Sequence, residues 1–315
     1  MTAAVRLSKT ALIVASLVLV AVPLTETASL VFFGTLLLLV GLPHGALDHV
    51  LFRNQFPDRG LRLHIHFYGF YLACLAAFAL VWWVLPIVAL VGFLAVSGYH
   101  FGQTQLTHLP APRWLQLAWG GWVLSALVYT HPESLHWGFL DVFAGVGQAQ
   151  LQQVFGYLAW ALLAATGVGL LRLVRRWPWA VVVEFAELAA IYLVFASTDF
   201  FVSFGLFFGG WHAMRALINL RSELRQGTPE NVSLLHLAKE ALPHTLASAV
   251  GIGAITWLAY WQGIGSQPAL VLFMGLSVVA LPHIVTVERW QRFRALAQGQ
   301  KKPGPVQALV TTKTV

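Results

Sequence analysis

Three observations predict an all-α, polytopic membrane protein: few charged residues, a high mean hydropathy, and long apolar runs separated by short loops. Charged residues make up 10 % of the 315 residues, whereas a soluble domain carries about 25 %. Hydrophobic residues make up 58 % of the chain, and the mean hydropathy is +0.73. This composition excludes a soluble enzyme, a disordered chain and a fibrous repeat, because so much apolar surface cannot stay dissolved in water.

A helix that crosses a bilayer needs about 20 mostly apolar residues. The stretches that qualify run over residues 11–25, 28–51, 64–85, 87–107, 114–130, 151–171, 179–197, 200–220, 236–261 and 267–288. The first is short and is read as half of a helical hairpin, not as a signal peptide, because no A-x-A-like cleavage site follows it. We therefore expect about 8–10 spans. Residues 1–297 should form one transmembrane bundle, and residues 298–315 a disordered cytoplasmic tail.

The distribution of basic residues predicts how the bundle is oriented. If alternate loops lie in the cytoplasm, beginning with the N-terminus, all but two of the 19 Lys and Arg residues fall in cytoplasmic segments. The other two, Arg215 and Lys239, lie near cytoplasmic helix ends. The positive-inside rule therefore predicts a multi-pass protein of the cell membrane with both termini in the cytoplasm. The net charge of +7 reflects this orientation, and we expect no nucleic-acid partner.

Histidine is the unusual residue, because several of the 12 histidines lie inside the predicted spans. At a rise of 1.5 Å per residue, five of them lie roughly 8–20 Å inside the cytoplasmic boundary. These five are His44, His100, His212, His244 and His283. Ionisable groups are costly in a bilayer and imidazole is the commonest transition-metal ligand, so the group predicts a metal site. A proton relay, substrate binding or a purely structural role stay open as alternatives.

Neighbouring residues could complete such a site. Asp48 lies one helical turn beyond His44, where it could orient that imidazole or bind a metal directly. His49 could join the site or bond to a neighbouring helix. His244 and His283 both follow an Ala-Leu-Pro sequence, in which the proline frees a backbone carbonyl and bends the helix. We expect at least one of these two histidines to lie at the metal, as a ligand or beside one.

Aromatic and acidic residues in the spans have two interpretations each. The 21 Phe, 13 Trp and 7 Tyr could simply pack the core and the interfaces. Those near the histidines could instead line a tunnel for a long apolar substrate, and they are Phe101, Phe204, Phe207, Phe208 and Trp211. Glu184 and Glu187 are three residues apart in one span, and we expect them to pair with Arg215 or with the histidines.

Three classes of function fit a histidine site within the bilayer. A desaturase or hydroxylase would carry paired histidine boxes, and only His64 and His66 come near that pattern. A haem-binding carrier or a metal-ion transporter should carry polar groups across the whole membrane, yet the outer half has few. The third class is an oxygenase that acts on an apolar substrate. Cys74 stands alone, which excludes an intramolecular disulfide and a thiolate metal site.

Four motifs resemble the Brp/Blh family, the membrane β-carotene 15,15′-dioxygenases of microbes that make retinal for rhodopsins. The motifs are PHGALDH at 43–49, YHFGQ at 99–103, WHAMR at 211–215, and ALPH at 241–244 and 280–283. The resemblance extends over about residues 30–290. It implies an Fe(II)-dependent oxygenase that adds O₂ across the central double bond of β-carotene and releases two molecules of all-trans-retinal. It also implies a functional link to a retinal-binding rhodopsin.

The resemblance implies that His44, His100 and His212 ligate the iron. One position departs from the family's pattern, which has a second histidine one turn after the histidine of the third motif. Here that residue is Ala216, whose methyl group cannot bind iron. The resemblance leaves open whether another residue, such as His49, His244 or His283, or a water molecule fills the place.

Overall fold

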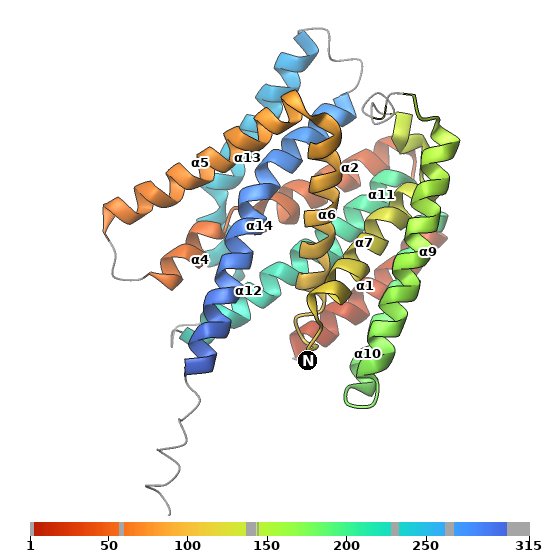
Figure 1. Cartoon of the computed structure of the whole chain (residues 1–315), viewed down its shortest axis with the longest axis horizontal. Coiled ribbons are helices and arrows are strands. Elements are labelled where there is room, and N and C mark those ends of the chain that lie inside the picture. The colour runs from red at the N-terminus through yellow and green to blue at the C-terminus, as the bar shows by residue number, and fades with distance from the viewer. Residues whose placement is uncertain are drawn as a thin grey trace, which may run out of the picture.

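The computed structural model describes residues 3–56, 60–136, 143, 145–227, 233–261 and 268–300. These residues form helices and connecting loops without a strand, which confirms the predicted all-α class. Eight of the helices are long and apolar enough to cross a membrane. The chain is therefore a multi-pass helical bundle (Figure 1).

The helices follow the predicted spans, but two of the spans are interrupted. Span 28–51 divides into α2 (Glu26–Leu36), the π-helix η1 (Leu37–Gly41), α3 (Leu42–Gly45) and α4 (Asp48–Gln55). Span 200–220 divides into α11 (Phe200–Gly205), the π-helix η3 (Leu206–Ala213) and α12 (Met214–Gly227). The other elements are α1 (Ala3–Ala21), α5 (Leu61–Val84), α6 (Pro86–Gln105), α7 (Arg113–Thr130), the 3-10 helix η2 (Pro132–His136), α9 (Gln148–Leu173), α10 (Pro178–Ser197), α13 (Leu234–Trp261) and α14 (Pro268–Gln300).

The predicted bounds of the first and last spans are wrong. Helix α1 begins at Ala3 instead of residue 11, so Lys9 lies within the helix and is 1 % exposed instead of lying in a loop. Buried carboxylates on α10 neutralise its charge, which is why this part of the chain can enter the bundle. Helix α14 continues past residue 288 to Gln300, while residues 301–315 of the predicted tail lie outside the described residues.

One half of the bundle is built around the packing of α6, α7 and α9, the most extensive helix contacts in the described chain. Two glycines allow α6 and α7 to approach closely. A Cβ atom on Gly102 would collide with the backbone carbonyl of Gln116, and one on Gly120 with that of Gly98. Such contacts between small residues are how helices associate where no hydrophobic effect drives them together.

The other half contains α5, α13 and α14, with α4 packed against α14. Helices α13 and α14 each contain an internal proline, Pro243 and Pro282, directly before a histidine. The π-helices η1 and η3 contact each other between the two halves. The N-terminal end of α1 and the C-terminal end of α14 lie at the same edge of the bundle in Figure 1. Which edge faces the cytoplasm stays a prediction.

Candidate metal centre

Three histidines from three separate elements meet inside the bundle. His44 lies on α3, His100 on α6 and His212 on η3. One nitrogen of each lies within 4.8 Å of one nitrogen of each of the others, and all three side chains are buried. This spacing is compatible with three imidazoles that bind one metal ion. A Zn–N(His) bond, for example, is about 2.0–2.1 Å long.

A fourth imidazole, that of His283 on α14, adjoins this group. Its ring centroid lies 4.9 Å from that of His44 and 5.1 Å from that of His100. The ring of His212 lies 5.0 Å from the rings of both His44 and His100. The four rings therefore form a closed circuit, which we call the histidine cluster. It contains His44, His100, His212 and His283.

Several nitrogen atoms of the histidine cluster are buried and have no hydrogen-bond partner. They are both ring nitrogens of His100, Nδ1 of His212 and Nε2 of His283. Nδ1 of His44 bonds to the carbonyl of Gly41, which leaves Nε2 of His44 to point elsewhere. Unsatisfied polar atoms are rare in protein interiors and costly, so a buried group of them facing one another fits a bound cation.

Asp48 lies beside the cluster, but its partner differs from the expected one. Its Oδ1 accepts a hydrogen bond of 2.8 Å from Nδ1 of His283, across the interface between α4 and α14. Its Oδ2 accepts a bond of 3.2 Å from the hydroxyl of Tyr71 on α5. The helix breaks at Leu47, between α3 and α4, which turns Asp48 away from His44. This arrangement fixes the tautomer of His283 and leaves its Nε2 as the free nitrogen.

His49 and His244 form a separate pair. Their rings stack with centroids 4.3 Å apart, and Nε2 of His244 lies 3.2 Å from the hydroxyl of Tyr68. Nε2 of His49 lies 3.3 Å from a carboxylate oxygen of Glu240. Of the two Ala-Leu-Pro-His histidines, the structure thus brings His283 and not His244 into the cluster.

Each π-helix is close in the chain to a residue of the histidine cluster: η1 precedes His44, and η3 contains His212. η1 ends just before Pro43, whose missing N–H leaves the preceding turn without a normal helical bond. η3 contains His212 itself, and π-helical turns often occur at functional sites. Gly209 lets η3 approach α2, because a Cβ atom there would lie 2.8 Å from Cβ of Leu36.

An apolar cavity of about 100 Å³, which we call the inner chamber, adjoins the histidine cluster. All four cluster histidines line it. Of the predicted tunnel residues, Phe101, Phe204 and Phe208 line it as well. The prediction is not supported for Phe207 and Trp211, which pack in the large core between α6, α7 and α10. Sequence reasoning missed Phe93 and Phe273, which line the chamber from α6 and α14.

A second cavity, of about 70 Å³, lies against the same histidines and has a more polar lining. His44, His100 and His283 border both cavities. The polar side chains of the second cavity are Thr104, Thr107, Asn219 and Gln291. Ala216 also lines it, so the residue at the divergent family position faces open space next to the cluster.

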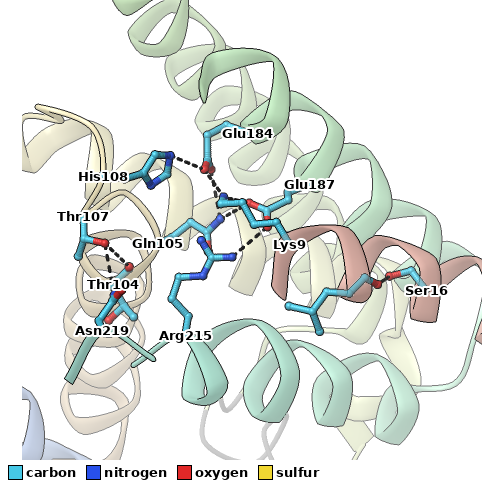
Figure 2. A network of polar contacts seen from close by, with 11 residues as sticks. Lys9, Ser16, Thr104, Gln105, Thr107, His108, Glu184, Glu187, Arg215 and Asn219 are labelled. Carbon is cyan, nitrogen blue, oxygen red and sulfur yellow. Dashed lines mark hydrogen bonds and ion pairs between the residues drawn. The ribbon is translucent and has the colours of Figure 1, made fainter. Parts of the chain in front are cut away.

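Figure 2 shows a buried network of charged and polar side chains. Two of its members follow cluster histidines closely along the chain. Lys9 of α1 contacts Glu184 and Glu187 of α10, and Nη2 of Arg215 donates a 3.1 Å hydrogen bond to Glu187. Gln105 donates to both carboxylates. The predicted pairing of Glu187 with Arg215 is confirmed. Because Arg215 follows His212 by three residues and Gln105 follows His100 by five, the network holds two of the helices that present the cluster.

His108 borders the network from the loop after α6. Its Nε2 lies 3.3 Å from a carboxylate oxygen of Glu184. Burial, together with the positive charges of Lys9 and Arg215, lowers the pKa of His108 to about 3. The imidazole is therefore neutral at physiological pH, and the network's charges are two carboxylates against Lys9 and Arg215.

The fold and the cluster define a class: a multi-pass membrane protein with a buried, histidine-rich candidate metal centre beside an apolar chamber. A family model described as β-carotene 15,15′-dioxygenase matches residues 35–291. The chain therefore belongs to that family of carotenoid-cleaving dioxygenases. The match includes all four cluster histidines but begins after α1.

Two relatives are similar to this chain over most of its length. A probable β-carotene 15,15′-dioxygenase of Halobacterium salinarum is 26 % identical over 289 residues, covering 81 % of this chain and 82 % of that protein. A β-carotene 15,15′-dioxygenase of an uncultured marine bacterium is 24 % identical over 280 residues, covering 80 % and 90 % respectively. No solved structure matches the chain.

Proposed function

We propose that this protein is an Fe(II)-dependent oxygenase that cleaves β-carotene at its central 15,15′ double bond with O₂ and releases two molecules of all-trans-retinal. The observation that carries the proposal is a group of three buried imidazoles, with that of His283 packed against it, beside an apolar chamber. Membership of the β-carotene 15,15′-dioxygenase family supports the choice of substrate.

The residues of the histidine cluster fit a divalent transition metal. Several of their buried ring nitrogens have no hydrogen-bond partner, one nitrogen each of His44, His100 and His212 lies within 4.8 Å of the others, and imidazole suits Fe, Zn, Cu and Ni alike. Ligation requires neutral imidazoles, and a charged one would be costly in these apolar surroundings. Bound Fe(II) would supply the activation of O₂. We assign His44, His100, His212 and His283 as the residues that hold it.

The other residues at the site orient a cluster histidine and enclose the inner chamber. The carboxylate of Asp48 holds His283 in one tautomer, and the hydroxyl of Tyr71 holds that carboxylate in turn. The aromatic lining, including Phe101 and Phe208, excludes water and presents flat surfaces against which a conjugated polyene can pack. Neither a nucleophile nor a general acid from the chain is required.

The location of the substrate explains why such an enzyme would be built into a membrane. A carotenoid dissolves in the hydrocarbon core of the bilayer, so a bilayer-embedded chamber avoids extracting it into water. We propose that the protein lies in the cell membrane with both termini in the cytoplasm. Its retinal would supply a retinal-binding rhodopsin.

The proposal is tested by expressing the chain in a bacterium that accumulates β-carotene and extracting its pigments for chromatography. We expect β-carotene to fall and retinal to rise. The matched control is His100→Ala, produced at the same level in the membrane, which should leave the pigment unchanged. Retinal formation that is equal in the wild type and in His100→Ala would contradict the metal-centre assignment, and no retinal from the wild type would contradict the reaction.

A further inference from the structure

A larger hollow, which we call the outer groove, lies between η1, α13 and α14. Its volume is about 550 Å³. Residues that line it include Leu38, Leu42, Ala249, Gly253, Trp257 and Leu276. Leu38 is 52 % exposed and Trp257 is 63 % exposed, so the outer groove opens on the outside of the bundle. That outer surface faces lipid, because the lining belongs to three helices that are apolar enough to span a membrane.

The outer groove adjoins the inner chamber. Leu42 and Leu276 line both hollows, the first from α3 and the second from α14. Leu42 is two residues before His44, and Leu276 is two turns before His283. These two leucines therefore form an apolar wall shared by the lipid-facing groove and the chamber that holds the histidine cluster.

Apart from the indole N–H of Trp257, the described side chains that line the outer groove offer no free hydrogen-bonding group to an occupant. Thr256, the one hydroxyl residue among its described lining residues, donates its Oγ1 hydroxyl to the carbonyl of Ile252 at 2.9 Å. Gly253 leaves open space, because a Cβ atom there would meet nothing within 4 Å. Together with Ala249, one turn earlier on the same face of α13, it makes a shallow trough. An occupant of this trough is hydrocarbon.

The inner chamber is too small to hold the proposed substrate alone. It encloses about 100 Å³, far less than a long polyene with a ring at each end. Cleavage at the central bond requires that bond to lie at the histidine cluster while both halves of the rigid molecule extend away from it. At least one half must therefore lie outside the inner chamber, and the outer groove is the apolar space that adjoins it.

We propose that the outer groove and the inner chamber form one binding site, which takes a rod-shaped polyene sideways from the bilayer. One end ring then lies in the outer groove, against Gly253 and Trp257, and the central polyene lies between Leu42 and Leu276. This inference rests on the proposed function for the identity of the substrate. It goes beyond it by assigning the entrance and the residues that bind half of the molecule.

The test fills the groove without touching the histidine cluster. Gly253→Phe adds a ring in the open space of the trough, and Gly251→Phe adds the same ring on the same helix where a Cβ also meets nothing within 4 Å, but outside the groove lining. Each protein is purified, without oxygen so that no cleavage occurs, from cells that accumulate β-carotene. The carotenoid retained per chain is then measured by absorbance. Cleavage is measured separately in air.

We expect Gly253→Phe to retain several-fold less carotenoid than the wild type and to cleave it more slowly, with unchanged iron content. Gly251→Phe should match the wild type in all three measurements. Equal retention by both variants, or no retained carotenoid in the wild type, would overturn the groove as a binding site. If the wild type retains carotenoid but forms no retinal in air, the proposed function fails while the groove assignment stands.

Discussion

At the scale of single residues, the choice between His244 and His283 decides what the candidate centre is. Both follow an Ala-Leu-Pro sequence at a similar predicted depth, and both remain candidates from the sequence. The structure separates them through the rotation of each helix about its own axis. α14 turns His283 toward His44 and His100, while α13 turns His244 toward His49 and Tyr68. Rotation depends on packing against neighbours, and loop charges and hydropathy do not report it.

Depth and residue type, in contrast, were available from the sequence. Basic residues at the helix ends place His44, His100 and His212 at one level, and the structure brings their nitrogens within 4.8 Å of one another. The sequence did not reveal the hydrogen-bond partner of Asp48. An i, i+4 spacing predicts a contact with His44, but the break at Leu47 redirects the carboxylate to His283.

We expect His283→Ala to lower metal binding strongly, because it removes one of four converging imidazoles. Asp48→Asn should weaken binding less, by about 10–100-fold, the usual effect of losing a group that orients a metal-binding histidine. Metal content after dialysis against a chelator measures both effects. His66→Ala, at an exposed position on α5, is the matched control.

Wild-type metal content in His283→Ala would remove that residue from the ligand set. If Asp48→Asn lost as much metal as His283→Ala, Asp48 would have to be a ligand itself instead of a positioning residue.

At the scale of elements, helix α1 is held to α10 by ion pairs of Lys9, a residue whose charge would be costly in the bilayer without these partners. Lys9 is 1 % exposed, and its partners Glu184 and Glu187 are fully buried. Removing one member of a buried ion pair leaves the other charges uncompensated, which costs about 3–5 kcal/mol. The family match begins after α1, so this helix supplies the neutralising cation from outside the matched region.

Lys9→Met should therefore lower the free energy of unfolding by about 3–5 kcal/mol. Thermal unfolding of the purified protein in detergent measures the change. Lys239→Met, at an exposed position of α13, removes the same charge without leaving a buried carboxylate unpaired. The account is wrong if both variants unfold at the same temperature as the wild type.

The two interrupted spans illustrate what apolar periodicity leaves out. Hydropathy predicts spans 28–51 and 200–220 as continuous, yet each contains a π-helix next to a cluster histidine. Pro43 is a local signal for the first interruption, because it cannot donate the bond that a regular helix needs. The second is accompanied by Gly209 and Gly210, whose close contacts with Leu36 and Leu12 become visible only after folding.

Gly120→Ala should destabilise the contact of α6 with α7, because the added methyl group would collide with the carbonyl of Gly98. Overpacking of this kind costs about 1–3 kcal/mol, and a collision with backbone falls at the upper end. Gly167→Ala on α9 is the control, since a Cβ there meets nothing within 4 Å. The comparison uses the temperature at which each variant loses its folded, monodisperse form. Equal temperatures for the two variants would refute the close approach of the helices.

At the scale of the whole molecule, the predicted orientation follows from charge alone and can be measured directly. We expect both termini to face the cytoplasm, since alternate loops from the N-terminus carry nearly all of the Lys and Arg residues. A reporter that is active only in the cytoplasm should be active when fused after Val315. A reporter that is active only outside the cytoplasm should be active when inserted after Gly147. The reverse pattern would invert the orientation.

In the folded bundle the apolar outer groove, the inner chamber and the four cluster imidazoles adjoin one another, and the proposed reaction depends on this arrangement. Fold class and the approximate positions of most spans were predictable, because the bilayer requires apolar helices of a set length. The convergence of four elements on one point was only partly predictable, since it requires the helices to be packed. The outer groove had no sequence signal, because its lining is ordinary for a lipid-facing helix.

The measurement that tests the central claim most directly is retinal formation by the purified protein after its metal has been removed and then restored. We predict that the metal-free protein is inactive, that Fe(II) restores cleavage of β-carotene with two retinal molecules formed per carotenoid consumed, and that Zn(II) does not. His100→Ala should regain no activity with either metal. Retinal formation by the metal-free protein, or none by the Fe(II)-loaded protein, would contradict the account.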